Sequence, residues 1–88
     1  MNIRNRIATM INNLDMAHGG RSQYSWDTIS RAIAGHIINN GLPPEDFVAA
    51  AIIAAEIWDG EGDGWMSTHV LEISIEIQNI LERVGVKI

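Results

Sequence analysis

The apolar residues near the start of the chain repeat with the spacing of an α-helix. Arg4, Asn5 and Thr9 fall between them, on the opposite side of a helical projection. A single apolar stripe of this kind is typical of a helix with one buried face. Gly19 and Gly20 interrupt the pattern within residues 17–24, so we expect the helix to end there. The stripe consists of Ile3, Ile7, Met10, Ile11 and Leu14.

A second helix is predicted to begin after Ser25 and to end near Gly41. Serine is a favoured residue at a helix N-cap, and glycine is a common residue just beyond a helix C-terminus. A third helix is predicted to begin within residues 42–46, where proline suits the first turn. Glu45 and Asp46 there oppose the positive end of the helix dipole. The apolar stripe of the second helix is Trp26, Ile29, Ile33 and Ile37.

The third helix is apolar on nearly every side. Residues 47–58 read FVAAAIIAAEIW, in which Glu56 is the only charged residue. A helix without a polar face lies either at the centre of a core or at an interface. Its five alanines permit a close neighbour. We favour the central position, and the alternative is a homo-oligomer contact through residues 47–55, from Phe47 to Ala55.

The last segment has two possible patterns. Residues 71–77, LEISIEI, alternate as a half-buried strand does, but a longer apolar series fits a helix. Length and the Glu, Gln and Leu content favour the helix, in which Leu71 and Ile75 would widen the buried face. We therefore predict an all-α fold, a compact four-helix bundle made of two helix–loop–helix units, as a single domain over residues 1–88. The helical series is Val70, Ile73, Ile77, Ile80, Leu81 and Val84.

Composition restricts the chemistry of the chain. With 88 residues there is length for one domain, and 47% hydrophobic residues, among them 15 isoleucines, are typical of a globular protein. The absence of cysteine excludes disulfides, thiolate zinc sites and thiol catalysis. The first residues do not resemble a signal peptide, and the apolar stretch 47–55 is too short to span a bilayer. We expect a cytoplasmic location and no membrane contact.

The charge of −5 is unevenly distributed. Residues 1–31 contain four arginines against two aspartates, whereas residues 32–82 contain nine acidic residues and neither lysine nor arginine. Such a half-molecule repels nucleic acid and attracts basic proteins or cations. We therefore expect no direct contact with nucleic acid. The alternative is a solvated surface with no specific partner.

Residues 58–67 have the spacing of calcium ligands. Asp59, Glu61 and Asp63 place oxygens at the first, third and fifth positions of a loop, and Gly64 follows at the sixth. In this respect residues 59–67 resemble the loop of the EF-hand and of its dockerin variant. The resemblance implies that Trp65 offers its carbonyl at the seventh position.

The same loop departs from the family at its twelfth position. A bidentate carboxylate is expected there, but this chain has Val70, and Glu72 lies two residues further on. Losing this ligand weakens calcium binding strongly. A flexible acidic loop between helices is the alternative, and our prediction is that the chain carries no cofactor, with Ca²⁺ as the second possibility.

No catalytic set is evident in the sequence. A phosphate-binding glycine loop and a nucleophile turn are both missing, and the three histidines are scattered along the chain. His69 and Glu72 are three residues apart, which predicts a pair on one helix face. We expect a protein that is not an enzyme.

The sequence favours a non-catalytic, acidic interaction module, an inhibitor or adaptor that occludes a basic, nucleic-acid-binding surface of a partner protein. In general composition it resembles phage-encoded inhibitors such as anti-CRISPR and anti-restriction proteins. Carboxylates would replace phosphates, and tryptophans would anchor the contact. The alternatives are a weak calcium-binding helix–loop–helix protein and a homo-oligomeric structural or adaptor protein. The predicted partner-binding residues are Trp58, Asp59, Glu61, Asp63, Trp65, Glu72 and Glu76.

Overall fold

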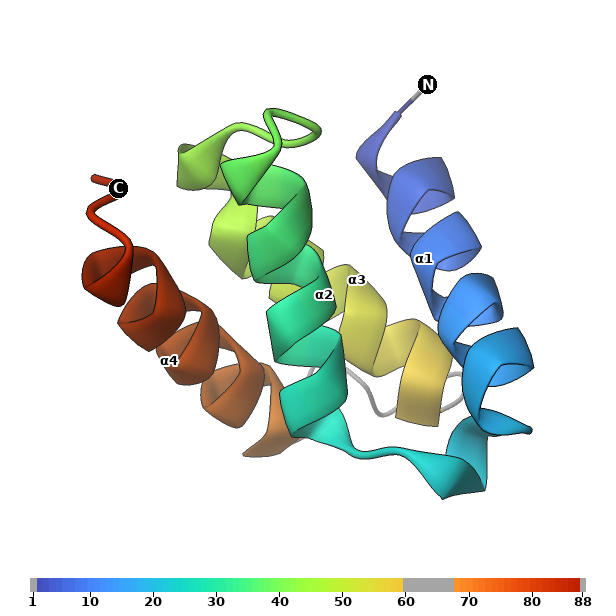
Figure 1. Cartoon of the computed structure of the whole chain (residues 1–88). Helices are drawn as coiled ribbons and strands as arrows, with labels where there is room; N and C mark the ends of the chain where they lie inside the picture. The colour runs from blue at the N-terminus through green and yellow to red at the C-terminus, as the bar shows by residue number, and fades with distance from the viewer. Residues whose placement is uncertain (1, 60–67, 88) are drawn as a thin grey trace.

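The computed structural model of the chain describes residues 2–59 and 68–87. This part contains the helices α1 (Ile3–His18), α2 (Trp26–Ile38), α3 (Phe47–Asp59) and α4 (Thr68–Arg83) (Figure 1). Two short 3-10 helices, η1 (Arg21–Gln23) and η2 (Pro44–Asp46), precede α2 and α3. Among the described residues there is no strand, so the all-α prediction is confirmed and residues 71–77 are helical.

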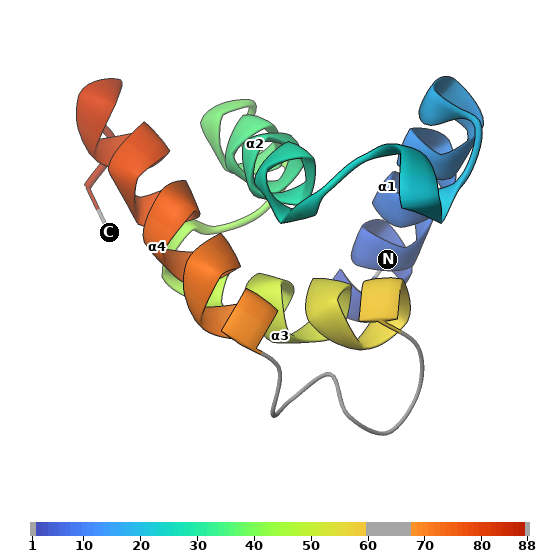
Figure 2. The same cartoon turned by 90° about the horizontal axis from the view of Figure 1, so that it is seen from below.

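The helices α2 and α3 form the centre of the bundle, and α1 and α4 lie on opposite sides of them (Figures 1 and 2). Along the chain the order is that of two helix–loop–helix units, as predicted. In space the units exchange partners, because α1 packs mainly against α3 and α2 mainly against α4. The two units therefore share one core.

The ends of α1 follow from local chemistry. The side chain of Asn2 accepts a hydrogen bond from the amide of Asn5 at 2.8 Å, which satisfies one of the free N–H groups of the first turn. At the other end Gly19 has φ +87°, a left-handed conformation that glycine adopts without steric cost. Its amide donates to the carbonyl of Asp15 at 2.9 Å, which ends the helix.

The end of α2 differs from the prediction. The helix ends at Ile38, three residues before Gly41, and Asn40 takes the left-handed conformation with φ 63°. Asparagine tolerates this region better than most residues. Gly41 is needed for another reason: its amide donates to the carbonyl of His36 at 2.6 Å, and a Cβ there would lie 3.1 Å from the same oxygen.

The core consists largely of isoleucines from the predicted stripes. Ile7 and Ile11 of α1, Ile29 and Ile33 of α2, and Ile73, Ile77 and Leu81 of α4 are fully buried, as the helical spacing predicts. Of the other predicted members of the last stripe, Val70 and Ile80 are partly buried, and Val84, beyond the end of α4, is 56% exposed. The α3 helix contributes small residues, so that α1, α2 and α4 all approach it. Its buried members are Ala50, Ala51, Ala54 and Ala55.

One expectation about α4 is wrong. Leu71 and Ile75 do not widen the buried face, because their exposed fractions are 64% and 48%. The core contacts are filled by Ile73, Ile77 and Leu81, which point to the opposite side of the helix. Over the described ranges, no helix combines the length and the apolar character that crossing a membrane requires.

Candidate interaction surface

Two rows of side chains follow the outward side of α4. Each row has the spacing i, i+4, i+7 and i+11, which keeps its members on one side of a helix. Because the buried stripe occupies the other side, these side chains are exposed or half-buried. We call them the α4 face. The first row is Leu71, Ile75, Gln78 and Glu82, and the second is Glu72, Glu76, Asn79 and Arg83.

The apolar part of the α4 face is Leu71 with Ile75. The two residues are one helical turn apart, and each is about half exposed or more. In Figures 1 and 2, α4 stands at the edge of the bundle, and α2 and α3 cover its inner side only. The first row therefore presents adjoining apolar side chains to solvent at its start and polar ones at its end.

The carboxylates of the face are only weakly neutralised. Glu72 Oε1 lies 3.3 Å from His69 Nδ1, and Glu76 Oε2 lies 3.8 Å from Arg83 Nη2. Glu82 has no cationic partner within ion-pair distance among the described residues. Exposed pairs of this kind contribute little to stability. The α4 face thus carries three glutamates against one arginine, and most of that negative charge is available to a partner.

The second half of the face is hollowed. One open depression is lined by Glu76, Asn79, Glu82 and Arg83. Another adjoins it at Glu82 and continues along Gln78 and residues 85–87. The outward surface of α4 therefore changes along its length, from exposed apolar side chains to a shallow polar trough lined by both acidic and basic side chains.

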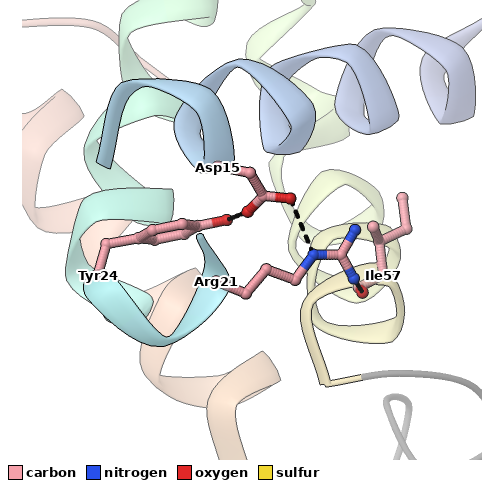
Figure 3. A network of polar contacts seen from close by, with 4 residues as sticks. All are labelled: Asp15, Arg21, Tyr24 and Ile57. Atoms are coloured by element: carbon pink, nitrogen blue, oxygen red, sulfur yellow. Dashed lines mark hydrogen bonds and ion pairs between the residues drawn. The ribbon is translucent and has the colours of Figure 1, made fainter. Parts of the chain in front are cut away.

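A polar network joins the end of α3 to α1 and η1 (Figure 3). Asp15 of α1 accepts a hydrogen bond from Tyr24 Oη at 2.5 Å and another from Arg21 Nε at 3.0 Å. Arg21 Nη1 also donates to the carbonyl of Ile57 at 2.6 Å, in the last turn of α3. A cation there complements the negative end of the helix dipole. The network ties α1, η1 and α3 together.

Burial and hydrogen bonding shift the pKa of two groups in this network. Burial raises the pKa of Tyr24, and the hydrogen bond to the Asp15 carboxylate raises it further. Burial also acts to raise the pKa of Asp15, but the hydrogen bonds from Tyr24 and Arg21 outweigh it and hold that pKa below its ordinary value. The network is therefore a neutral phenol donating to a stable carboxylate.

A row of rings connects this network to α4. The ring of Tyr24 lies 5.4 Å from that of His18 and 6.4 Å from that of Trp58, between centroids. Trp58 in turn meets His69 edge to face at 4.9 Å. His69 is in the first turn of α4, so the row sets where the α4 face begins.

The predicted partner-binding residues have different positions. Glu72 and Glu76 lie together on the α4 face, as their spacing implies. Asp59 is exposed at the end of α3, whereas Trp58 is partly buried in the row of rings and packs against the core. The predicted pair of His69 and Glu72 is present. Glu61, Asp63 and Trp65 lie outside the described residues, as does most of the predicted calcium loop.

Sequence reasoning missed two parts of the surface. The sequence predicts Leu71 and Ile75 in the core, but both are exposed, and their neighbours in LEISIEI do not distinguish them from the buried Ile73. The arginines of the first helix are engaged inside the chain. Arg4 pairs with Glu56 at 2.8 Å, and Arg6 donates to the carbonyl of Gly41 at 2.6 Å. One of the nine acidic residues thus has an arginine partner from the basic half.

Within residues 2–59 and 68–87, no three acidic or histidine side chains are grouped so as to hold a metal ion. Val70, at the position of the missing twelfth ligand, packs against the core. Comparisons of the chain with protein families, with curated proteins and with solved structures found no significant match.

Proposed function

We propose that this chain is a non-catalytic interaction module that covers a basic surface of a partner protein with its α4 face. The observation that carries the proposal is the combination of exposed Leu71 and Ile75 with Glu72 and Glu76 on one side of one helix. Interfaces join an apolar centre to charged flanks in this way, and the charge selects the partner.

The sign of the charge supports a protein partner. Residues 32–82 supply neither lysine nor arginine, and only Arg83 and Lys87 follow, so a phosphate backbone or an anionic membrane meets mainly carboxylates along this half of the chain. A partner surface rich in lysine and arginine is attracted instead. In proteins such surfaces commonly bind nucleic acid.

The mechanism proposed is occlusion. Glutamates of the α4 face take the places of phosphates on the partner, and the apolar pair excludes water beside them. The chain then acts as an inhibitor or adaptor, in the manner expected from its compositional likeness to anti-CRISPR and anti-restriction proteins. Glu61, Asp63 and Trp65 remain sequence-based candidates for the same surface.

A displacement assay tests the proposal. Protamine, an arginine-rich DNA-binding protein, is bound to a fluorescent DNA duplex, and release of the duplex is followed by anisotropy as the chain is added. We expect release at low salt that weakens as salt is raised. The pair of substitutions Glu72→Gln and Glu76→Gln should raise several-fold the concentration of the chain that is needed to release the duplex.

The control variant has the same net charge as the variant with Glu72→Gln and Glu76→Gln. Glu45→Gln with Asp46→Asn also removes two negative charges, but from η2 at the start of α3. We expect this variant to release the duplex nearly as well as the unmodified chain. If the two double variants lose equal activity, net charge alone acts and the α4 face is not the binding surface. If the unmodified chain releases no duplex, the proposal fails.

A further inference from the structure

The exposed apolar residues of α4 form a short ridge with a defined charge on one flank. Leu71 and Ile75 are separated by one turn, a rise of about 6 Å along the axis. Glu72 and Glu76 repeat the same spacing beside them, so that each apolar side chain has a carboxylate next to it. Apolar and acidic side chains thus run as parallel lines along one helix.

Parallel lines of this spacing match the surface of another helix. Ridges formed by residues four apart pack into the grooves between corresponding ridges of a partner helix. An amphipathic helix carries its apolar residues at the same intervals and places its charged residues along their edge. A helix lying along α4 would cover Leu71 and Ile75 and then pass over the trough around Glu82.

We infer that the partner contacts α4 through an amphipathic helix whose apolar stripe is bordered by lysine or arginine. The inference rests on the proposed function and specifies the element that binds. Charge decides between this occupant and a second copy of the chain. A second α4 face would bring three more glutamates and only one arginine, so like charges would predominate between the two faces, and like charges placed together at an interface cost affinity.

The alanines of α3 do not offer a competing surface for a second copy. Ala50, Ala51, Ala54 and Ala55 are fully buried against helices of the same chain. The other exposed large apolar residues belong to different elements: Met16 to α1, Ile38 to the end of α2, Val48 to α3 and Val84 to the residues just after α4. The α4 face is therefore the place where two exposed large apolar side chains adjoin on one helix of the described chain.

The test uses a designed peptide of leucine and lysine whose leucines follow helical spacing. Its binding to the full chain is measured by anisotropy of a peptide label, and its helix content by circular dichroism. Two further peptides are compared: one of the same composition in scrambled order, and one with glutamate in place of lysine. We expect only the amphipathic lysine peptide to bind and to gain helix content.

Paired variants locate the contact. Leu71→Ser with Ile75→Ser should weaken peptide binding about tenfold, the loss expected when two half-exposed apolar side chains no longer become buried. The matched control, Met16→Ser with Val48→Ser, removes two exposed apolar side chains from other helices and should leave binding unchanged. Thermal melts of all variants establish that each is folded.

The inference would be overturned if the two double variants lost peptide binding equally, or if the scrambled peptide bound as well as the amphipathic one. Sedimentation of the chain alone adds a further check, since a dimer abolished by Leu71→Ser with Ile75→Ser would assign the face to a second copy instead. The two proposals fail separately. Duplex release that depends on Glu72 and Glu76, without helix-specific peptide binding, keeps the function and rejects the amphipathic helix.

Discussion

The hydroxyl of Tyr24 provides a direct test of the polar network that joins α1, η1 and α3. Tyr24→Phe removes that hydroxyl and keeps the ring that packs near Trp58. A hydrogen bond to a charged group contributes about 1.5–3 kcal/mol. The Asp15 side chain is 22% exposed, so water can partly replace the lost donor, and we expect the lower value, about 1.5 kcal/mol. For a domain of this size that lowers the melting temperature by roughly 6–12 °C.

The pH dependence follows from the direction of each shift. Burial, and then the bond to Asp15, raise the pKa of Tyr24 above its ordinary value of 10.0. The contribution of the neutral phenol to the free energy of unfolding is fully present below about pH 10 and is lost as the pH rises towards the folded-state pKa of Tyr24. The stability difference between the chain and Tyr24→Phe should therefore narrow above about pH 10. For Asp15, whose pKa is lowered from 3.8, stability is present above that pH and is lost as the pH falls through the folded-state pKa.

The measurement is selective because the chain has a single tyrosine. Phenolate absorbance reports Tyr24 alone, and circular dichroism at each pH shows whether the helices persist. Asp15→Asn keeps an oxygen acceptor without the charge, so the pKa of the phenol should move back towards its ordinary value. If the phenol of the folded chain ionises at its ordinary pKa, or if Tyr24→Phe melts at the unmodified temperature, the reasoning from the network is refuted.

Two further predictions concern α3 and the calcium loop. Ala54→Leu should lower the free energy of unfolding by about 1–3 kcal/mol through overpacking, at every protein concentration. The control, Ala49→Leu on the exposed side of α3, should have little effect. An Ala54→Leu chain that melts at the unmodified temperature and only changes its association state would contradict this prediction. Melting temperatures in calcium and in chelator should be equal, because Val70 packs against the core and the Glu72 carboxylate pairs with His69. A saturable rise in melting temperature with calcium would show that the loop binds the ion.

The helices were predictable because each buried face is marked by isoleucine at intervals that only a helix places on one side. Ile7 and Ile11, or Ile73 and Ile77, could be assigned to the core from spacing alone. Spacing does not show how wide a face the neighbouring helices cover. Leu71 and Ile75 have the same interval as the core pairs, and their exposure depends on the positions of α2 and α3 around α4.

The network around Asp15 was beyond prediction for a different reason. Arg21 and the carbonyl of Ile57 are 36 residues apart, and no periodic pattern connects them. The bonds from Arg21 and Tyr24 to Asp15 are local, since both close over the turn at Gly19 and Gly20. A polar contact to a backbone carbonyl leaves no trace in composition, whereas the uneven distribution of acidic residues was visible at once.

The exchange of partners between the two helix–loop–helix units has a consequence for how the chain comes apart. If the backbone were cut between α2 and α3, each fragment would retain a pair of helices that touch each other less than they touch the helices of the other fragment. Neither fragment would then have a complete interior of its own. Folding of the cut protein would become an association of two chains, with a midpoint that depends on their concentration. The short connection at residues 39–43 thus keeps together two halves, each of which completes the interior of the other.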